Sequence, residues 1–527
     1  MPRAARFRRA EGRIATPHHL ATDVGAAVLR SGGNAADAAV AAGVALAVVA
    51  PYECGVGGDL FAIVWDGQVE VYNGSGRAPA GIAPDRVRAR AGGRGMSLFG
   101  PDTVTVPGAV AGWFDILDRH GSRPFAALAA PAVELAREGF ALSERGASAI
   151  RRGGEQSGSS AAWRAIYEPA LRRRFLVQPD LGRLLARLQR DGRDALYTGE
   201  VAAAIAAAVR SAGGALGADD LRSHRGEWVA PVGAEFRGHR VHQAPPNSQG
   251  IAALEGLAAL EREPLESLGA AERHWLLVAA ATLAVAERDR FVADPDHMAL
   301  APSELLAAAR IAELGRALGR RIAAGPPAGA ADRGQTAYLC CADRHGLLVG
   351  LIQSNFVGFG SGITVSGWGI NLHNRGAGFS LARGHPNELG GRKRPLHTLM
   401  PALITAGGEP THLLGMMGGT NQIAIQLQLL TSLLVDGESP AEALRAPRWA
   451  LGAEGQLLVE PELVPLLRAG AAERGHSIAE ADGGSGDVGY AQALVVGDGA
   501  AAADSRSEGS AAGEGPPYAG GRASGGA

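Results

Sequence analysis

The order of helix-like and strand-like segments is the feature that most constrains the fold of this chain. Helix signals dominate from about residue 124 to 318, and after Gly334 short apolar runs replace them. The runs TAYLCCAD and LLVGLIQSN flank a turn at 344–346, and LFAIVWDGQVEVYN contains another turn at 66–67, which predicts two antiparallel hairpins. Strands paired in hairpins and covered by helices fit this order better than the parallel sheet of a dinucleotide-binding fold.

Local signals predict the remaining elements. Asn34 suits the N-cap of a helix that has Asp37 at its third position. The chain after about residue 514 is Gly, Ala, Ser and Pro, and this composition predicts a disordered tail over 514–527. Further helices are expected over about 22–31 and 422–435, and strands over 456–459 and 491–496.

Composition narrows the classes of function. The 527 residues carry a net charge of −2, which argues against nucleic acid as the main partner. Lys393 is the single lysine, so a phosphate-binding loop with a Walker lysine is excluded. Neither a G-x-S-x-G elbow nor an H-E-x-x-H motif occurs. The three cysteines cannot form a disulfide framework, which favours a reducing compartment.

The sequence gives no sign of a membrane segment or an export signal. The basic N-terminus has no apolar core behind its arginines, unlike a secretory signal. The longest uncharged apolar runs, 38–50 and 275–286, fall short of the roughly 20 residues that a membrane helix needs. We therefore expect a cytoplasmic protein that has neither a membrane nor nucleic acid as a partner.

Segments spread from Ala15 to about Gly513 carry a family resemblance. They are LATDVGAAVLRSGGNAADAAVAAGVALAVVAPYECGVGGDLF, TVTVPGAVAGW, PAVELAREGF, APPNSQG, AERDRFVADPD, TAYLCCADRHG, QSNFVGFGSG, NRGAGF, RPLHTLMPALI and GMMGGTNQ. With these segments in this order, the chain resembles the γ-glutamyltranspeptidase family of N-terminal-nucleophile hydrolases. The resemblance implies an α/β (α+β) fold, a four-layer αββα sandwich with two sheets between helical layers.

The resemblance also implies a self-processing precursor. Such proenzymes cut their own chain before a threonine, which by position is Thr336, so the cleavage site lies between Gln335 and Thr336. The products are a large subunit of residues 1–335 and a small subunit of 336–527. They share one intertwined fold as a heterodimer, which can assemble further into a higher oligomer. No metal and no organic cofactor are implied.

Chemistry gives each implied catalytic residue a role. After cleavage, Thr336 carries a free α-amine with a pKa of about 8, so one residue supplies both the nucleophile and its general base. Its β-methyl group restricts χ1 and so orients the hydroxyl. Ser354 aligns with a family threonine that hydrogen-bonds the nucleophile. Gly418 and Gly419 align with the oxyanion glycines, because two glycines before a helix let backbone N–H groups approach a developing negative charge.

Residues of the implied substrate site match the family only in part. Arg77 aligns with the arginine that clamps the α-carboxylate of the substrate, and its planar fork suits bidentate binding. Asn355 retains a substrate-binding position. Departures from the family are Phe356 for an asparagine, Arg375 for a glutamine, Gly378 for an aspartate and His397-Thr398 for paired serines, together with a stretch from 379 to 395 that is too short for the lid loop.

These departures bear on the substrate. The missing aspartate at Gly378 pairs with the α-ammonium of a γ-glutamyl donor, and leaving that ammonium unpaired costs several kcal/mol. We hypothesise that Arg77 and Arg375 together bind an acidic acyl donor without this ammonium, such as a glutaryl or oxamate amide. The resemblance as a whole implies a self-processing amide hydrolase or acyltransferase that forms an acyl-enzyme with γ-glutamyl or related acidic acyl amides. The alternatives are a dicarboxylate-monoamide hydrolase without transferase activity, a γ-glutamyltransferase acting on glutathione and a scaffold homologue that has lost processing.

Overall fold

The hairpin predicted after Gly334 forms the centre of the larger of the two main sheets. The computed structural model describes residues 12–157, 160–321, 334–452, 455–481, 486–497 and 499–513, so the predicted tail lies outside the described residues. Strand β9 (Gln335–Ala342) pairs antiparallel with β10 (Leu348–Phe356). The second predicted hairpin is also confirmed, as β2 (Asp59–Trp65) and β3 (Val69–Asn73). The full order of the sheet is β20 (Ser510–Gly513), β1 (Arg13–Thr16), β9, β10, β2, β3 and β6 (Glu227–Val229).

A second sheet of six strands packs against the first. Its pairings are all antiparallel, as the sequence predicts. The order of this sheet is β19 (Ala501–Ala503), β18 (Tyr490–Val495), β14 (Glu409–Met417), β13 (Ala402–Ala406), β8 (His239–Gln243) and β7 (Val232–Phe236). Residues before and after Thr336 contribute strands to both sheets, so neither part of the chain can form its sheets alone.

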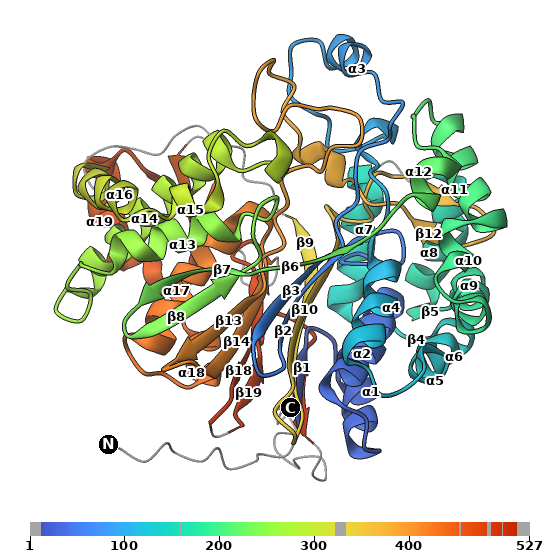
Figure 1. The fold of residues 1–527 in the computed structure, drawn as a ribbon, viewed down its shortest axis with the longest axis horizontal. Helices are drawn as coiled ribbons and strands as arrows, with labels where there is room; N and C mark the ends of the chain where they lie inside the picture. Colours follow the sequence, from blue (N-terminus) through green and yellow to red (C-terminus); the bar gives the residue numbers. More distant parts are fainter. Residues whose placement is uncertain are drawn as a thin grey trace.

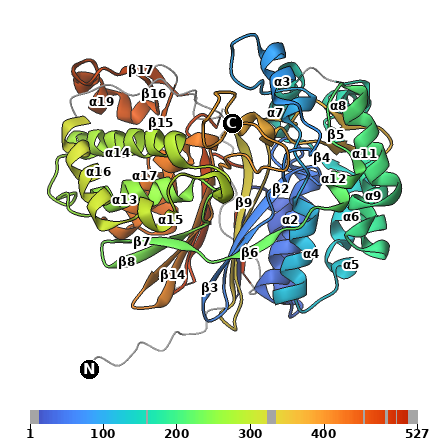
Figure 2. The same ribbon diagram turned by 45° about the horizontal axis from the view of Figure 1, so that its top comes forward.

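Helices cover the outer face of each sheet, which gives the four layers seen in Figures 1 and 2. The predicted N-cap is confirmed, because Asn34 and Asp37 form a capping box at the start of α2. Helix α1 begins earlier than predicted, since the His18 ring accepts the N–H of Leu20 and caps it. The helices α1 (His19–Arg30), α2 (Ala35–Val49) and α4 (Ala109–His120) contact the larger sheet, and α6 (Ala130–Glu138), α9 (Pro179–Asp191) and α11 (Gly199–Ser211) lie outside them. The helices α13 (Gly250–Leu260) and α17 (Gln422–Leu434) contact the smaller sheet, and α14 (Ala270–Phe291) and α16 (Ala308–Arg321) pack on them.

The alternation of side chains along β9 separates the layers. Leu339 and Cys341 point to the helical layer of α1 and α2, whereas Tyr338 and Cys340 pack between the two sheets. This inner layer also contains Leu403 and other apolar side chains of the second sheet. The predicted four-layer αββα sandwich is therefore confirmed.

Smaller elements complete the described chain. They are α3 (Pro84–Ala91), α5 (Phe125–Leu128), α7 (Glu144–Ser157), α8 (Ala161–Arg173), α10 (Asp194–Tyr197), α12 (Ala218–Arg222), α15 (Pro302–Leu305), α18 (Pro440–Arg445), α19 (Val464–Ala471), β4 (Phe140–Ala141), β5 (Phe175–Leu176), β11 (Thr364–Val365), β12 (Ile370–Asn371), β15 (Trp449–Leu451), β16 (Gln456–Val459) and β17 (Ser477–Glu480). Within the described ranges, no helix combines the length and the apolar character that crossing a bilayer requires.

Candidate active site

Thr336 is the second residue of β9 and lies where the pairing with β10 becomes irregular. The register pairs Gln335 with Phe356 and then shifts across a bulge before Gln353. Thr336 shares one face of β9 with Tyr338, which packs between the two sheets, and only 1% of Thr336 is exposed. The predicted nucleophile is therefore buried between the sheets at the start of β9.

The hydroxyl of Ser354 is the centre of the polar contacts of Thr336. The Thr336 hydroxyl donates to Ser354 Oγ at 3.2 Å, and Ser354 in turn donates to the carbonyl oxygen of Gln335 at 2.6 Å. The backbone N–H of Phe356 donates to the same Ser354 Oγ at 2.7 Å. One serine hydroxyl thus links the predicted nucleophile with the carbonyl of the predicted cleavage site.

The glycine loop after β14 lies against the predicted cleavage site. Gly418 has φ 151° and Gly419 has φ 56°, conformations that favour glycine. A Cβ on Gly334 would lie 2.9 Å from Gly419 Cα, so only a residue without a side chain lets the two backbones approach this closely. The Gln249 amide donates to the carbonyls of Gly419 and Thr398, at 3.0 Å each, and so fixes the loop.

Arg375 lies beside these residues rather than on the surface. Only 1% of it is exposed, its Cζ lies 4.0 Å from the centroid of the Phe356 ring, and an N–H of its guanidinium donates to Thr398 Oγ1 at 3.0 Å. Phe356 adopts φ 77°, a strained conformation for a bulky residue that costs about 1–3 kcal/mol and that the surrounding packing maintains.

These contacts form a closed ring at the start of β9. Neighbouring residues in the ring are joined by a hydrogen bond, by the arginine–aromatic contact or by close backbone packing, and the chain itself closes the ring from Gly334 through Gln335 to Thr336. In order, the ring joins Thr336, Ser354, Phe356, Arg375, Thr398, Gln249, Gly419 and Gly334, which precedes the predicted cleavage site. The structure therefore brings together residues that the sequence separates by more than 160 positions.

His397 belongs to a fully buried network of charges beside this ring. Its Nε2 lies 3.0 Å from Asp59 Oδ2, and its Nδ1 accepts the N–H of Leu399 at 3.2 Å. His373 Nδ1 lies 3.3 Å from the same Asp59 oxygen, and its Nε2 lies 2.9 Å from the Thr105 carbonyl. The side chains of Asp59, His373 and His397 are all 0% exposed.

The charges of this network follow from burial and contact. Burial and, second to it, the positive charge of Arg375 lower the pKa of His397 to about 3, so its imidazole is neutral and Nε2 carries the proton donated to Asp59. Burial by itself raises the pKa of the Asp59 carboxyl, but His373 and His397 outweigh it and hold that pKa well below its usual range. Asp59 is therefore ionised at neutral pH.

The structure places Arg77 apart from the ring. Its guanidinium lies 3.1 Å from Asp294 and 3.7 Å from Glu227, and it donates to the carbonyl of Arg392 at 3.1 Å. About a third of the side chain is exposed, and a hollow of about 1220 Å³ opens beside it. None of these contacts connects Arg77 with Thr336.

Asn355 points away from the ring, into the loop between α2 and β2. Its side-chain amide donates to the Pro51 carbonyl at 3.2 Å, and a Cβ on Gly58 would lie 2.9 Å from its Oδ1. Its backbone N–H donates to the Glu53 carbonyl at 3.0 Å. Asn355 therefore fastens this loop to the end of β10.

Gly378 and the segment after it, which the sequence predicts to be too short for a lid loop, pack against the N-terminal part of the chain. A Cβ on Gly378 would lie 2.7 Å from the Leu396 carbonyl oxygen, so the position tolerates no aspartate without movement. Phe379 and Leu389 pack on Ala78 and the residues around α3. The segment therefore folds back on the N-terminal part of the chain.

Sequence reasoning missed several buried polar residues near the ring. Asp59 and Glu53 both lie in the matched segment PYECGVGGDLF, where two carboxylates in an otherwise apolar, glycine-rich run were the available signal. His373 and Tyr490 had no such signal, because only the fold brings them to the site.

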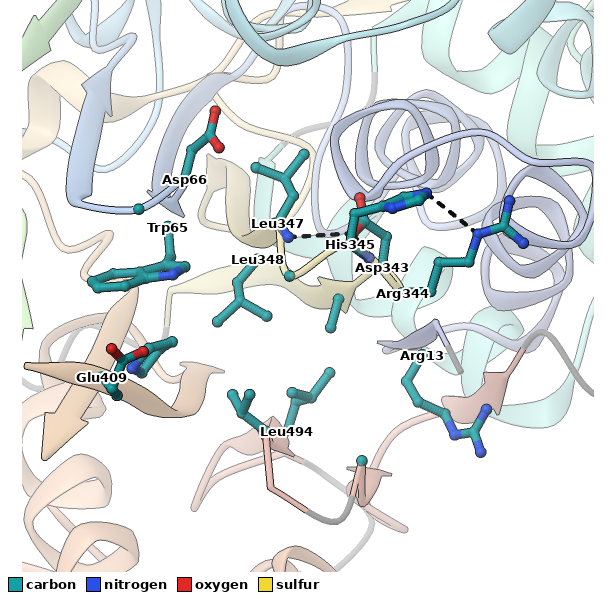
Figure 3. Close-up of a pocket in the computed structure, with 16 residues that line it drawn as sticks. Arg13, Trp65, Asp66, Asp343, Arg344, His345, Leu347, Leu348, Glu409 and Leu494 are labelled. Carbon is teal, nitrogen blue, oxygen red and sulfur yellow. Dashed lines mark hydrogen bonds between the residues drawn. The ribbon is translucent and has the colours of Figure 1, made fainter. Parts of the chain in front are cut away.

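The cavity in Figure 3 lies at the other end of β9 and belongs to a different surface. It has a volume of about 550 Å³, and Ala342 and Leu348, which face each other across the hairpin turn, line it together with Trp65 and Leu494. Across the described residues, no group of three or more His, Cys, Asp and Glu side chains could hold a metal ion.

Comparison with known proteins gives a consistent picture. The family model described as gamma-glutamyltranspeptidase matches residues 21–514. The glutathione hydrolase-like YwrD proenzyme of Bacillus subtilis is 36% identical over 83% of this chain and 85% of its own length. The oxamate amidohydrolase proenzyme of Klebsiella pneumoniae is 32% identical over 95% of this chain and 98% of its own. The crystal structure of cephalosporin acylase from Bacillus halodurans superposes with a TM-score of 0.89, at 32% identity over 95% of each chain.

The sandwich of two sheets between helical layers, which superposes on the cephalosporin acylase, is the fold of the N-terminal-nucleophile hydrolases. The protein is an enzyme of this class, a self-processing amide hydrolase. Within the class, the chain belongs to the γ-glutamyltranspeptidase family.

Proposed function

We propose that Thr336 is the nucleophile and that the chain is cut between Gln335 and Thr336. The mature enzyme then hydrolyses amides of small acidic acyl groups. The observation that supports this proposal most directly is the Ser354 hydroxyl, which contacts both the Thr336 hydroxyl and the Gln335 carbonyl. These two contacts support a role for Ser354 in breaking the peptide bond between Gln335 and Thr336.

Processing must proceed without the α-amine, because the Gln335 carbonyl still acylates it. Thr336 Oγ1 attacks that carbonyl carbon, and its proton passes through Ser354 Oγ to the carbonyl oxygen. The hydroxyl formed on that oxygen then gives its proton back through Ser354 Oγ, and the Thr336 nitrogen takes it. The C–N bond breaks as the C=O bond re-forms, which leaves an ester between Gln335 and Thr336 Oγ1. Water hydrolyses this ester and frees the Gln335 carboxylate and the Thr336 amine.

Catalysis then uses the amine that processing has made. The neutral amine takes the Thr336 hydroxyl proton as Oγ1 attacks the substrate amide, and the leaving amine takes the proton back. Backbone N–H groups of the loop at Gly418 and Gly419 stabilise the developing oxyanion. Water resolves the acyl-enzyme in the same way and regenerates Thr336.

Charge around the ring favours an acidic acyl group. Arg375 places a positive charge within one hydrogen bond of Thr398, and Gly378 offers no carboxylate for a substrate ammonium. Arg77 is already paired with Asp294, so we assign recognition of the acidic group to Arg375 and Thr398. The relatives include a protein named for oxamate hydrolysis, which fits a dicarboxylic acid monoamide as the substrate class.

Two fragments of one precursor remain together in this proposal. The larger sheet needs β1, β2, β3 and β6 from residues 1–335 and β9, β10 and β20 from 336–527. Separating the fragments would expose the layer of apolar side chains between the sheets, so the mature form is a heterodimer.

A γ-glutamyl hydrolase or transferase is the second candidate. The similarity to the YwrD proenzyme, whose name describes it as glutathione hydrolase-like, favours it. A panel of γ-glutamyl, glutaryl and oxalyl anilides, assayed with and without a dipeptide acceptor, separates the two candidates. Preference for glutaryl or oxalyl donors supports our proposal, and preference for the γ-glutamyl donor enhanced by the acceptor refutes it.

The same preparation tests processing. Wild-type protein should give two bands on a denaturing gel, and Thr336→Ala should give one. Sequencing the N-terminus of the smaller fragment should begin at Thr336. A single wild-type band that persists with no turnover of any donor would identify a scaffold homologue instead.

A further inference from the structure

Tyr490 and Glu53 form a buried polar pair next to Thr336 that the proposed reaction does not use. Tyr490 begins β18 in the second sheet, and its hydroxyl lies 3.4 Å from the carbonyl oxygen of Thr336. The same hydroxyl forms a short hydrogen bond with the Glu53 carboxyl. Tyr490 is 1% exposed and Glu53 is 6% exposed, so both side chains are buried from bulk solvent.

The single proton of the Tyr490 hydroxyl cannot form a full hydrogen bond with both Glu53 and the Thr336 carbonyl at once. The Tyr490 hydroxyl has a single hydrogen, whereas the carbonyl of Thr336 and an ionised Glu53 carboxylate both require a donor. A neutral Glu53 carboxyl has a proton of its own and can donate to the Tyr490 oxygen. The protonation state of Glu53 therefore decides where the tyrosine proton points.

The surroundings allow both states of Glu53. Burial raises the pKa of its carboxyl to about 7, and the positive charge of Arg145 and the hydrogen bond from Tyr490 oppose this rise. Arg145 Cζ lies 5.0 Å from the centroid of the Tyr490 ring. The other titratable groups that face the pair are Tyr52, which donates to Glu508 at 2.7 Å, Glu508 itself and the buried thiol of Cys54.

We propose that Glu53 and Tyr490 are positioning residues that orient the nucleophile in a proton-dependent way. When Glu53 is neutral, it donates to Tyr490, and Tyr490 donates its own proton to the carbonyl of Thr336. When Glu53 is ionised, it takes the Tyr490 proton, and the Thr336 carbonyl loses this anchor. Glu53 also holds the end of β10 from the other side, because its backbone carbonyl accepts the N–H of Asn355, the neighbour of Ser354.

The Glu53–Tyr490 pair should make kcat fall as the pH rises. The anchor is present below about pH 7 and is lost as the pH rises through this value. The α-amine of Thr336 must be neutral, so its contribution to kcat rises with pH toward about 8. The profile of kcat should therefore show two titrations of opposite sign, and removing the pair should leave only the rising one.

This inference rests on the proposed function, since it assigns an orienting role around Thr336. The test compares the pH profiles of kcat for processed wild type, Tyr490→Phe, Glu53→Gln and the control Tyr338→Phe. Tyr338 lies on β9, the strand of Thr336, and its buried hydroxyl has no hydrogen-bond partner among the described residues. The donor is whichever anilide of the panel the wild type turns over fastest.

We expect Tyr490→Phe to lower kcat about three- to tenfold at pH 6 and much less at pH 9, the size expected for one hydrogen bond. Glu53→Gln keeps a permanent amide donor toward Tyr490, so it should lose the falling titration near pH 7. Tyr338→Phe should follow the wild type. A Tyr490→Phe profile identical to that of Tyr338→Phe, or a falling titration that persists in Glu53→Gln, would overturn the proposal.

A second measurement does not need turnover. Infrared difference spectra of the Thr336→Ala protein between pH 6 and 9 should contain the C=O bands of two buried carboxyls, Glu53 and Glu255. Adding Glu53→Gln should remove the Glu53 band and leave the Glu255 band. A spectrum that Glu53→Gln does not change would refute the titration of Glu53 even if no donor is hydrolysed. Failure of the donor panel alone would instead count against the proposed function.

Discussion

The hydroxyls of Thr336 and Ser354 lie 3.2 Å apart across the bulge between β9 and β10. The bulge matters because it turns Ser354 toward the start of β9, where its oxygen also receives the N–H of Phe356. With that N–H and the Thr336 hydroxyl as donors, the one proton of Ser354 is left for the Gln335 carbonyl. The direction of each hydrogen bond is therefore fixed by the backbone.

Replacing Ser354 should slow processing more than it disturbs the fold. Ser354→Ala removes the path by which the Thr336 proton reaches the Gln335 carbonyl, and we expect chain cleavage to slow about 100-fold. Ser354→Thr keeps the hydroxyl and should cleave at close to the wild-type rate. A time course on denaturing gels measures this rate, and equal rates for the alanine and threonine variants would contradict the role of Ser354.

Arg375 should determine the preference for acidic donors. Arg375→Gln removes the positive charge beside Thr398, so KM for a glutaryl anilide should rise about 10- to 100-fold, the loss expected for a charge-assisted hydrogen bond. The KM for an uncharged acyl anilide should change little. Arg383→Gln is the matched control, because this arginine is about three-quarters exposed and pairs with Asp85 on the surface. An equal rise in KM for both donors would indicate a general loss of structure.

Much of the fold could be predicted because its strands are local hairpins. The pairs β9–β10 and β2–β3 each join neighbouring runs through a short turn, so alternation and turn residues suffice to predict them. The pair β1–β20 could not be predicted in this way. It joins Arg13–Thr16 with Ser510–Gly513, short segments at opposite ends of the chain whose sequences have no strong strand pattern.

The buried polar residues beside the site could not be predicted from the sequence, for a different reason. Sequence patterns place carboxylates and imidazoles at the surface, so Asp59, His373 and His397 could not be expected to meet with no exposure to water. Family resemblance indicated the position of His397 but not its partners. Only the antiparallel pairing that sets Asp59 opposite Ser354 brings this carboxylate to the site.

Removing the charge of Asp59 should destabilise the protein strongly. The pKa of this carboxyl is depressed in the folded state, so its stabilising contribution is present above the unfolded pKa of about 4 and is lost as the pH falls below it. In the Thr336→Ala background, where the chain stays whole, Asp59→Asn should lower the free energy of unfolding by about 3–5 kcal/mol at pH 7. Urea denaturation measures the loss.

The exposed Asp219, which pairs with Arg222 on the surface, provides the control for Asp59. Asp219→Asn should change the unfolding free energy by less than about 1 kcal/mol. If Asp59→Asn behaved like Asp219→Asn, the buried network would carry no net stabilisation, and the positions of His373 and His397 would have to be held by packing alone.

Glu255 should show the opposite dependence on pH. It lies on α13 with 1% exposure, and burial together with the charge of Glu287 raises the pKa of its carboxyl to about 8. Between about pH 4.5 and 8 the unfolded chain releases this proton while the folded protein retains it, so stability falls over this range. Glu255→Gln should therefore raise the free energy of unfolding by roughly 1–3 kcal/mol at pH 8 and have little effect at pH 4.5.

Thermal unfolding of the Thr336→Ala chain at the two pH values measures this difference for Glu255→Gln. Glu134→Gln, on the exposed face of α6, serves as the control. Its effect on Tm should be small and the same at both pH values. Arg310 lies 3.5 Å from the Glu255 carboxyl and also pairs with Glu287. A loss of stability at pH 8 would mean that Glu255 is ionised and that its attraction to Arg310 outweighs the cost of burial.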